Sequence, residues 1–186
     1  MFSHTGPLLA LCSVLTSALC CDWLTEYSDL RNSSVTLVEL MGGAFTDQES
    51  PVPFPYKLYA QVEKKGLESQ LLFIRDSLEQ IYLLFRSNNH SSANWDTRKT
   101  TQFLESLHRQ VVELSSCVPK KRTDSRLRNY YRRLKNSTLS CPGGSAASWE
   151  LLRRETKDHL DRLDLLGNLV KASAASRGRP ADSSTL

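Results

Sequence analysis

The chain has 186 residues, of which 40% are hydrophobic and 24% are charged, and its formal net charge is +4. This composition is ordinary for a globular protein and provides enough apolar material for one core, so we expect one domain with tails. The charge is by itself too small to indicate a nucleic-acid-binding protein.

The first 20 residues differ from the rest of the chain. Pro7 to Leu19 carry no charge and are mostly apolar, but this run is shorter than the roughly 20 residues of a membrane span. The small residues Ala18 and Cys20 would precede a cleavage site before Cys21. We therefore predict a signal peptide at residues 1–20 and a secreted, extracellular product, with a buried N-terminal helix as the alternative. No later segment is apolar enough to span a membrane, so we expect no membrane insertion.

Apolar residues spaced about 3.6 residues apart predict a first helix from Asp22 to Met41, which Gly42-Gly43 would end. A long connection follows, from Ala44 to Gly66, and its three prolines exclude a regular helix through its middle. Long connections inside compact domains are often functional. A short turn of helix is expected around Tyr56 to Val62.

Four more segments with helical spacing of apolar residues follow. The chain then continues in a tail of small and polar residues, 172–186, that we expect to be disordered. The predicted fold is all-α, a bundle of about five main helices that forms one domain over residues 21–171. The four later helices are predicted at Leu67–Arg86, Asp96–Ser116, Asp124–Lys135 and Ala146–Lys171.

Five cysteines, Cys12, Cys20, Cys21, Cys117 and Cys141, would enter an oxidising compartment on export. Cleavage after Cys20 leaves three of them, which predicts one disulfide and one spare thiol. Cleavage after Ala18 would keep Cys20 and permit two disulfides. These residues alone leave the pairing open.

Three glycosylation sequons fit the same compartment, at Asn32, Asn89 and Asn136. Such tripeptides are common by chance. Asn89 lies in a polar stretch and is the best candidate, whereas Asn32 lies inside a predicted helix.

Enzymatic motifs are weak. Glu105 and His108 match one Glu-x-x-His element of di-iron bundles, but that site needs a second such element, and Glu155 and His159 have the wrong spacing. We find no glycine-rich nucleotide loop, paired-cysteine zinc signature or nucleophile elbow. We therefore expect a protein that is not an enzyme and needs no metal or cofactor.

The sharpest electrostatic feature is the segment from Lys120 to Lys135, the basic patch, which has Asp124 as its only acid. Its four apolar residues would face the core and turn the cations outward. Export argues against nucleic acid, so an acidic receptor surface or a sulfated glycan is the favoured partner, and a merely solvated face is the alternative. The basic residues are Lys120, Lys121, Arg122, Arg126, Arg128, Arg132, Arg133 and Lys135.

Ordered short motifs along the mature chain resemble those of fish type I interferons. Each is weak alone, but their order and spacing together are specific, above all in the last helix. The matching stretches are Cys21-Asp22-Trp23-Leu24, Leu40-Met41-Gly42-Gly43, Pro53-Phe54-Pro55, Leu58-Tyr59, Phe73-Ile74, Ile81, Leu84-Phe85, Trp95-Asp96, Phe103-Leu104, Arg109-Gln110, Ser116-Cys117-Val118, Arg126-Leu127, Tyr130-Tyr131, Leu134, Ser145, Trp149 to Lys157, and His159 to Asp164.

The resemblance implies a class II helical cytokine with long crossover connections. It implies a secreted antiviral cytokine, expected to be a monomer, that binds a heterodimeric cell-surface class II cytokine receptor and triggers JAK-STAT signalling and antiviral gene expression. It also implies the Cys21–Cys117 disulfide of the group with one conserved bridge, which leaves Cys141 unpaired. The alternatives are another helical cytokine, such as a lambda-type interferon or an interleukin-10 relative, and a secreted glycan- or lipid-binding helical bundle.

In type I interferons generally, the long loop and the last helix contact one receptor chain, and the middle helices contact the other on the opposite face. Carried over, the last-helix contacts align with Arg153, Arg154, Lys157 and Asp158. Asp158 departs from the basic residue often present there. Helical spacing places Arg153 and Lys157 off the predicted core stripe, where a receptor could reach them.

Overall fold

The computed structural model describes residues 22–86, 88–139 and 144–177. Within these residues it contains α-helices and one 3-10 turn but no strand, so the predicted all-α bundle is confirmed. In chain order the elements are α2 (Asp22–Leu40), α3 (Tyr56–Glu63), α4 (Leu67–Arg86), η1 (Ser91–Ala93), α5 (Thr97–Cys117), α6 (Ser125–Thr138) and α7 (Ala146–Arg177).

Two predicted helix ends fall several residues short, since α6 continues from the predicted Lys135 to Thr138, and the larger difference is at the end of the chain. The last helix was expected to end at Lys171, but α7 continues to Arg177. Alanine is the best helix former, and the extra turns contain three alanines among residues 172–175. Ala174 also packs against the core, which gives the extension an apolar contact. The rest of the predicted tail, residues 178–186, lies outside the described residues.

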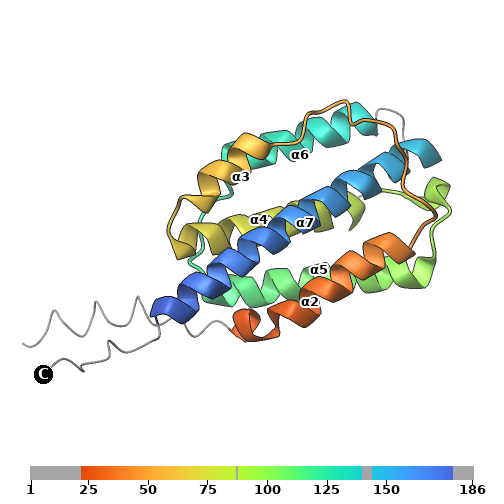
Figure 1. The fold of residues 1–186 in the computed structure, drawn as a ribbon. Helices are drawn as coiled ribbons and strands as arrows, with labels where there is room; N and C mark the ends of the chain where they lie inside the picture. The colour runs from red at the N-terminus through yellow and green to blue at the C-terminus, as the bar shows by residue number, and fades with distance from the viewer. Residues whose placement is uncertain (1–21, 87, 140–143, 178–186) are drawn as a thin grey trace, which may run out of the picture.

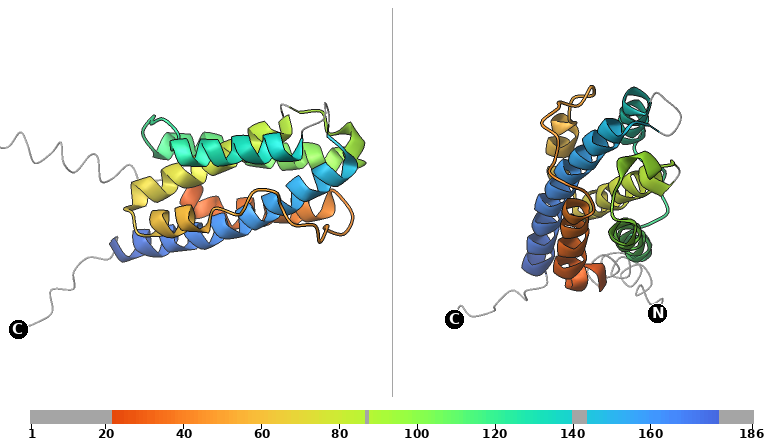
Figure 2. Two further views of the ribbon diagram at one scale, coloured as in Figure 1. Left: turned by 90° about the horizontal axis from the view of Figure 1, so that it is seen from above. Right: turned by 90° about the vertical axis from the view of Figure 1, so that its right-hand side faces the viewer.

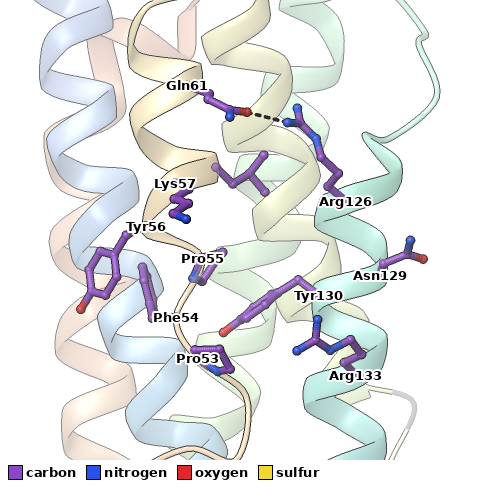
Figure 3. A pocket seen from close by; sticks show the side chains of 11 residues that line it. Pro53, Phe54, Pro55, Tyr56, Lys57, Gln61, Arg126, Asn129, Tyr130 and Arg133 are labelled. Atoms are coloured by element: carbon purple, nitrogen blue, oxygen red, sulfur yellow. Dashed lines mark hydrogen bonds between the residues drawn. The ribbon is translucent and has the colours of Figure 1, made fainter.

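The long connection makes the topology a crossover bundle (Figures 1 and 2). It runs back along the bundle after α2, so α2 and α4 point in the same direction. The helix α2 packs along α5 and α7, and α4 packs against α5, α6 and α7. The second half of the connection and α3 lie beside α6, as Figure 3 shows from close by. The ends of the described chain, at residues 22 and 177, lie at the same end of the bundle.

Aspartates begin two of the helices. The Asp96 carboxylate accepts a hydrogen bond from the Lys99 backbone N–H at 2.9 Å, and Asp124 accepts one from the Arg126 N–H at 2.8 Å. The first N–H groups of a helix have no partner within the helix, so these side chains stabilise the ends at which α5 and α6 begin. The hydrogen bond from Lys99 also lowers the pKa of Asp96.

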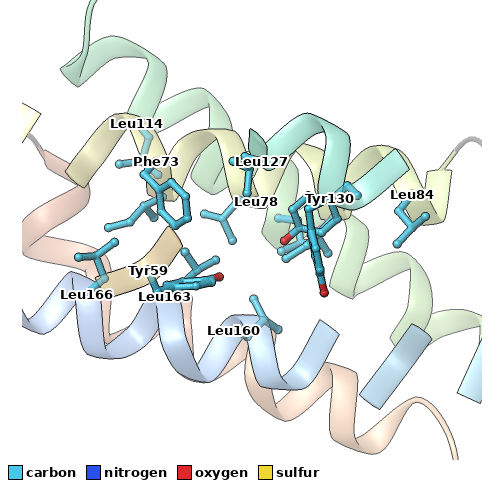
Figure 4. Packing of buried hydrophobic residues seen from close by; sticks show 14 of the residues in the cluster. Tyr59, Phe73, Leu78, Leu84, Leu114, Leu127, Tyr130, Leu160, Leu163 and Leu166 are labelled. Atoms are coloured by element: carbon cyan, nitrogen blue, oxygen red, sulfur yellow. The ribbon is translucent and has the colours of Figure 1, made fainter. Parts of the chain in front are cut away.

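One continuous core joins all the helices (Figure 4). Its largest fully buried side chains include Trp23, Phe85, Phe103 and Trp149. Each large apolar side chain contributes about 1.5–3 kcal/mol when it leaves water. The polar residue Ser34, which interrupts the apolar stripe of α2, is also buried, since Gln110 donates to its hydroxyl at 2.8 Å.

Candidate functional site

The C-terminal end of α2 is closed by Arg153 of α7, whose side chain is fully buried. The prediction that Arg153 lies off the core stripe, where a receptor could reach it, is wrong. Its guanidinium donates to the carbonyl oxygens of Val38 at 3.0 Å, Glu39 at 3.1 Å and Gly43 at 2.6 Å. The last carbonyls of a helix have no partner within the helix, and a cation there complements the helix dipole. Arg153 therefore acts as a C-terminal cap supplied by another helix.

Glu150 holds this guanidinium from one turn earlier on α7. Its Oε2 accepts from the Arg153 Nη2 at 2.7 Å and from the Nε at 2.9 Å. Its other oxygen accepts from the indole N–H of Trp95, just before α5. The Arg153 guanidinium also lies 4.0 Å from the centroid of the Phe45 ring. These contacts join α7, the end of α2, the long connection and the start of α5.

Gly42 leaves the space that Arg153 occupies. A Cβ at this position would lie 2.9 Å from the Arg153 Nε and 3.0 Å from the Trp95 Cδ1, whereas a Cβ on Gly43 would meet nothing within 4 Å. We expect Gly42→Ala to lower the free energy of unfolding by about 1–3 kcal/mol, because buried overpacking forces neighbours to shift. Gly43→Ala is the matched control, and urea unfolding measures both. Equal losses in the two variants would contradict this account.

The three other predicted receptor residues lie along the surface of α7. Arg154 is half-buried and donates to the carbonyl oxygen of Gln48 at 2.8 Å, so it holds the long connection. Lys157 pairs with Asp161 at 2.7 Å and with Glu39 at 3.4 Å. Unlike Arg153, Asp158 is exposed and Lys157 is partly exposed.

An exposed apolar pair on α7 was missed by the sequence analysis. Leu165 is 52% exposed and Leu169 is 46% exposed, and their four-residue spacing places them on one face of the helix. Tyr56, at the start of α3, is 59% exposed, and the Arg162 guanidinium lies 5.1 Å from the centroid of its ring. The signal was present in the sequence, because both leucines fall outside the predicted core stripe. We call Tyr56, Arg162, Leu165 and Leu169 the α7 face.

A buried polar network holds α3 and α6 against α7 (Figure 4 labels two of its tyrosines). His159 contacts the Tyr59 hydroxyl through Nδ1 at 2.8 Å and the Tyr130 hydroxyl through Nε2 at 3.0 Å. Tyr130 in turn donates to Glu155 at 3.3 Å. Burial lowers the pKa of His159 to about 3, so the ring is neutral, and burial raises the pKa of Glu155. The Phe54 ring lies 4.5 Å from the His159 ring, which anchors the long connection to this network.

The basic patch lies where the sequence predicted. Leu127, Tyr130, Tyr131 and Leu134 are buried, so the orientation of α6 is confirmed. Among the described residues, two of the eight cations form ion pairs: Lys121 with Glu68 at 2.5 Å and Arg126 with Asp124 at 2.8 Å. The other six, Lys120, Arg122, Arg128, Arg132, Arg133 and Lys135, lie at the surface fully or in part.

Cys117 is disulfide-bonded, and the other four cysteines lie outside the described residues. The Cys21–Cys117 pairing and the spare thiol at Cys141 therefore stay predictions. Among the sequons, Asn89 and Asn136 are exposed, while the side chain of Asn32 on α2 is not described. Their glycosylation also stays a prediction.

Neither a metal-binding cluster nor a membrane-spanning helix is present among the described residues. They hold no group of three or more His, Cys, Asp or Glu side chains placed to bind a metal ion. His108 of the Glu-x-x-His element is exposed, with its ring 5.3 Å from that of Tyr82. None of the described helices has an apolar stretch long enough to cross a bilayer.

Comparisons with known proteins identify the family. Residues 28–169 match the model of the interferon alpha/beta domain. The chain is 38% identical over 168 residues to interferon a3 of Oncorhynchus mykiss, covering 89% of this chain and 95% of that protein. The solved structure of zebrafish interferon 1 superposes with a TM-score of 0.70 at 32% identity, covering 81% of this chain and 99% of the other. This chain therefore belongs to the interferon alpha/beta family, as its motifs and crossover helical bundle predicted.

Proposed function

We propose that this chain is secreted and acts by bringing together the two chains of a class II cytokine receptor at the cell surface. The receptor would then trigger JAK-STAT signalling and antiviral gene expression. Membership of the interferon family, whose members are cytokines of antiviral innate immunity, supports this proposal over the other helical cytokines considered. The mechanism is non-covalent: a rigid monomeric bundle presents two surfaces, and no residue performs chemistry.

The observation that carries the proposal is the α7 face. Neighbouring apolar side chains that together remain exposed on one face often mark a protein interface, whereas single exposed ones are ordinary. Here Leu165 and Leu169 share a face of α7 with Arg162, whose guanidinium lies 5.1 Å from the ring centroid of Tyr56 in the long connection. Aromatic and arginine side chains such as those of Tyr56 and Arg162 are enriched where binding energy is concentrated. Lys157 and Asp158 lie on the same helix and remain candidates for polar contacts, whereas buried Arg153 does not.

The second receptor chain would contact the opposite side of the bundle. Val112 of α5 is 55% exposed and provides an apolar contact there. The helix α5 packs along α2 and α4, so its outward face is supported by the core. A ligand that keeps its shape loses little conformational entropy on binding.

The decisive experiment applies the purified mature chain to fish cells that carry receptors for type I interferons. We expect phosphorylation of STAT proteins, induction of antiviral transcripts and a lower viral yield at nanomolar dose. Folded protein that gives none of these responses would contradict the proposal. Cells that lack either receptor chain are the control, and an undiminished response in them would exclude this receptor mechanism.

The double variant L165A/L169A tests the α7 face. We expect its signalling potency to fall about tenfold or more, because truncating a central interface residue typically costs about 2 kcal/mol or more of binding energy. Leu83→Ala is the control, since Leu83 is 42% exposed on α4. Circular dichroism should show unchanged helical content in both variants. Full potency of the double variant would exclude this face as a receptor contact.

A further inference from the structure

An open groove of about 770 Å³ lies between the long connection, α3 and α6 (Figure 3). Its polar lining comes from Lys57 and Gln61 of α3 and from Arg126, Asn129 and Arg133 of α6. The lining thus has three cations and two amides, and it includes no carboxylate. We call this the α6 groove.

The floor of the α6 groove is apolar and shaped by the long connection. Pro53 and Pro55 line it together with Leu58 and the ring of Tyr130. The Tyr130 hydroxyl is engaged by His159 and Glu155, so this ring is held in place. Flat, rigid apolar surfaces beside charged groups suit a ligand that has both C–H faces and anionic substituents.

Charge around the groove is strongly one-sided. The helix α6 carries five basic residues and no acidic one. Arg126 and Arg133 are seven residues apart, which is about 10 Å along a helix, so one extended polyanion could contact both. Arg126 is already held, since its guanidinium donates to the Asp124 carboxylate and to the Gln61 Oε1 at 2.5 Å across the groove. Arg133 and Lys57 form no ion pair within the described residues, so these two cations could bind an anion without breaking one.

We propose that the α6 groove binds a sulfated glycan chain. Guanidinium and ammonium groups form charge-assisted hydrogen bonds to sulfate oxygens. The Asn129 amide and the Gln61 NH2 group, whose partner oxygen already accepts from Arg126, would bond to sugar hydroxyls, and the prolines and Tyr130 would pack against the sugar rings. A linear polymer fits a groove whose cations lie on both walls, Lys57 on one and Arg133 on the other. Such binding would retain the cytokine on the cell surface or matrix, and it does not depend on the receptor mechanism proposed above.

The test compares two double variants with equal loss of charge. K57Q/R133Q removes one cation from each wall of the groove. R132Q/K135Q removes two cations from the other side of α6, where both line a hollow beside α4. Isothermal titration with a heparin octasaccharide at about 0.15 M salt, where charges beyond roughly 8 Å are screened, measures the affinity of each.

We expect K57Q/R133Q to bind at least about tenfold more weakly than the wild type, because a single hydrogen bond to a charged group is worth about 1.5–3 kcal/mol. The control variant should stay within about threefold, since its cations lie outside the groove. Equal losses would show diffuse attraction and overturn the proposal, as would the absence of wild-type binding. Matching thermal unfolding curves exclude misfolding, since both substituted groove residues are exposed.

Other polyanions test the class of ligand. Desulfated heparin, a single-stranded DNA of equal charge and phosphatidylserine vesicles should each bind at least about tenfold more weakly than the octasaccharide, if sulfates and sugar rings are both recognised. DNA or vesicles that bind as tightly, and lose affinity in K57Q/R133Q, would assign the groove to those ligands instead.

Discussion

Replacing Arg153 with methionine should lower the free energy of unfolding by about 3–5 kcal/mol, the cost of removing one partner from a buried ion pair. The guanidinium is fully buried, so solvent does not screen its contacts. Its loss would leave the carbonyl oxygens of Val38, Glu39 and Gly43 without this donor and would leave Glu150 without its cation. Since folded domains are stable by only about 5–15 kcal/mol, this one contact holds a large share of the total.

Arg154→Met is the matched control for this prediction. Arg154 is the next residue on α7 and is half-buried, and its guanidinium donates to the backbone carbonyls of Thr46 and Gln48 in the long connection. We expect it to cost about 1 kcal/mol or less, the range of an ordinary exposed hydrogen bond. Urea unfolding followed by circular dichroism measures both variants. Equal losses would contradict the capping role of Arg153. If Arg153 acts only through stability, the folded fraction of Arg153→Met should signal with wild-type potency.

The sequence predicted the helices well because each has a local cause. Apolar spacing marks the buried faces of α4 and α5, Asp96 and Asp124 stand where α5 and α6 begin, and Gly42-Gly43 follows α2. All of these signals lie within a few residues of the feature they predict. The end of α7 was not predicted because a short stretch of small and polar residues can form either a disordered tail or a helix. The contact of Ala174 with the core forms only in the folded bundle, so the local sequence does not show it.

The role of Arg153 could not be read from local sequence. A cation off the apolar stripe of a helix ordinarily faces solvent, and the carbonyl oxygens that Arg153 caps lie 110 to 115 residues away along the chain. The motifs nevertheless included the residues of this contact, at separate positions along the chain. Gly42, Trp95 and Arg153 belong to three separate stretches of the family resemblance, and they meet at the end of α2. Here, residues within the matching motifs hold the helices together. A match to the family therefore does not by itself distinguish a structural residue from a receptor contact.

The second large effect concerns pH. Burial lowers the pKa of His159 in the folded chain to about 3, while a histidine in the unfolded chain titrates near 6.5. Between these values the unfolded chain binds a proton that the folded chain does not, so stability falls as pH falls. We expect a loss of about 1.4 kcal/mol per pH unit below about 6.5, or roughly 3 kcal/mol at pH 4.5.

The variant His159→Phe isolates this effect, because it keeps a ring in the site and removes the titrating group. Carboxyl groups nearby act in the opposite direction. Burial of Glu155 and partial desolvation of the Asp158 carboxyl raise the pKa values of both groups, so they add stability as pH falls through their titration. They remain in the variant and largely cancel in the difference. The free energy of unfolding in urea, measured for both proteins from pH 7.5 to 4.5, should therefore decrease more steeply for the wild type below about pH 6.5, by about 1.4 kcal/mol per pH unit. The variant starts from a lower value, because the hydroxyls of Tyr59 and Tyr130 lose their partner. The difference should thus be largest at neutral pH and shrink in acid, whereas parallel curves would show that His159 titrates normally in the folded chain.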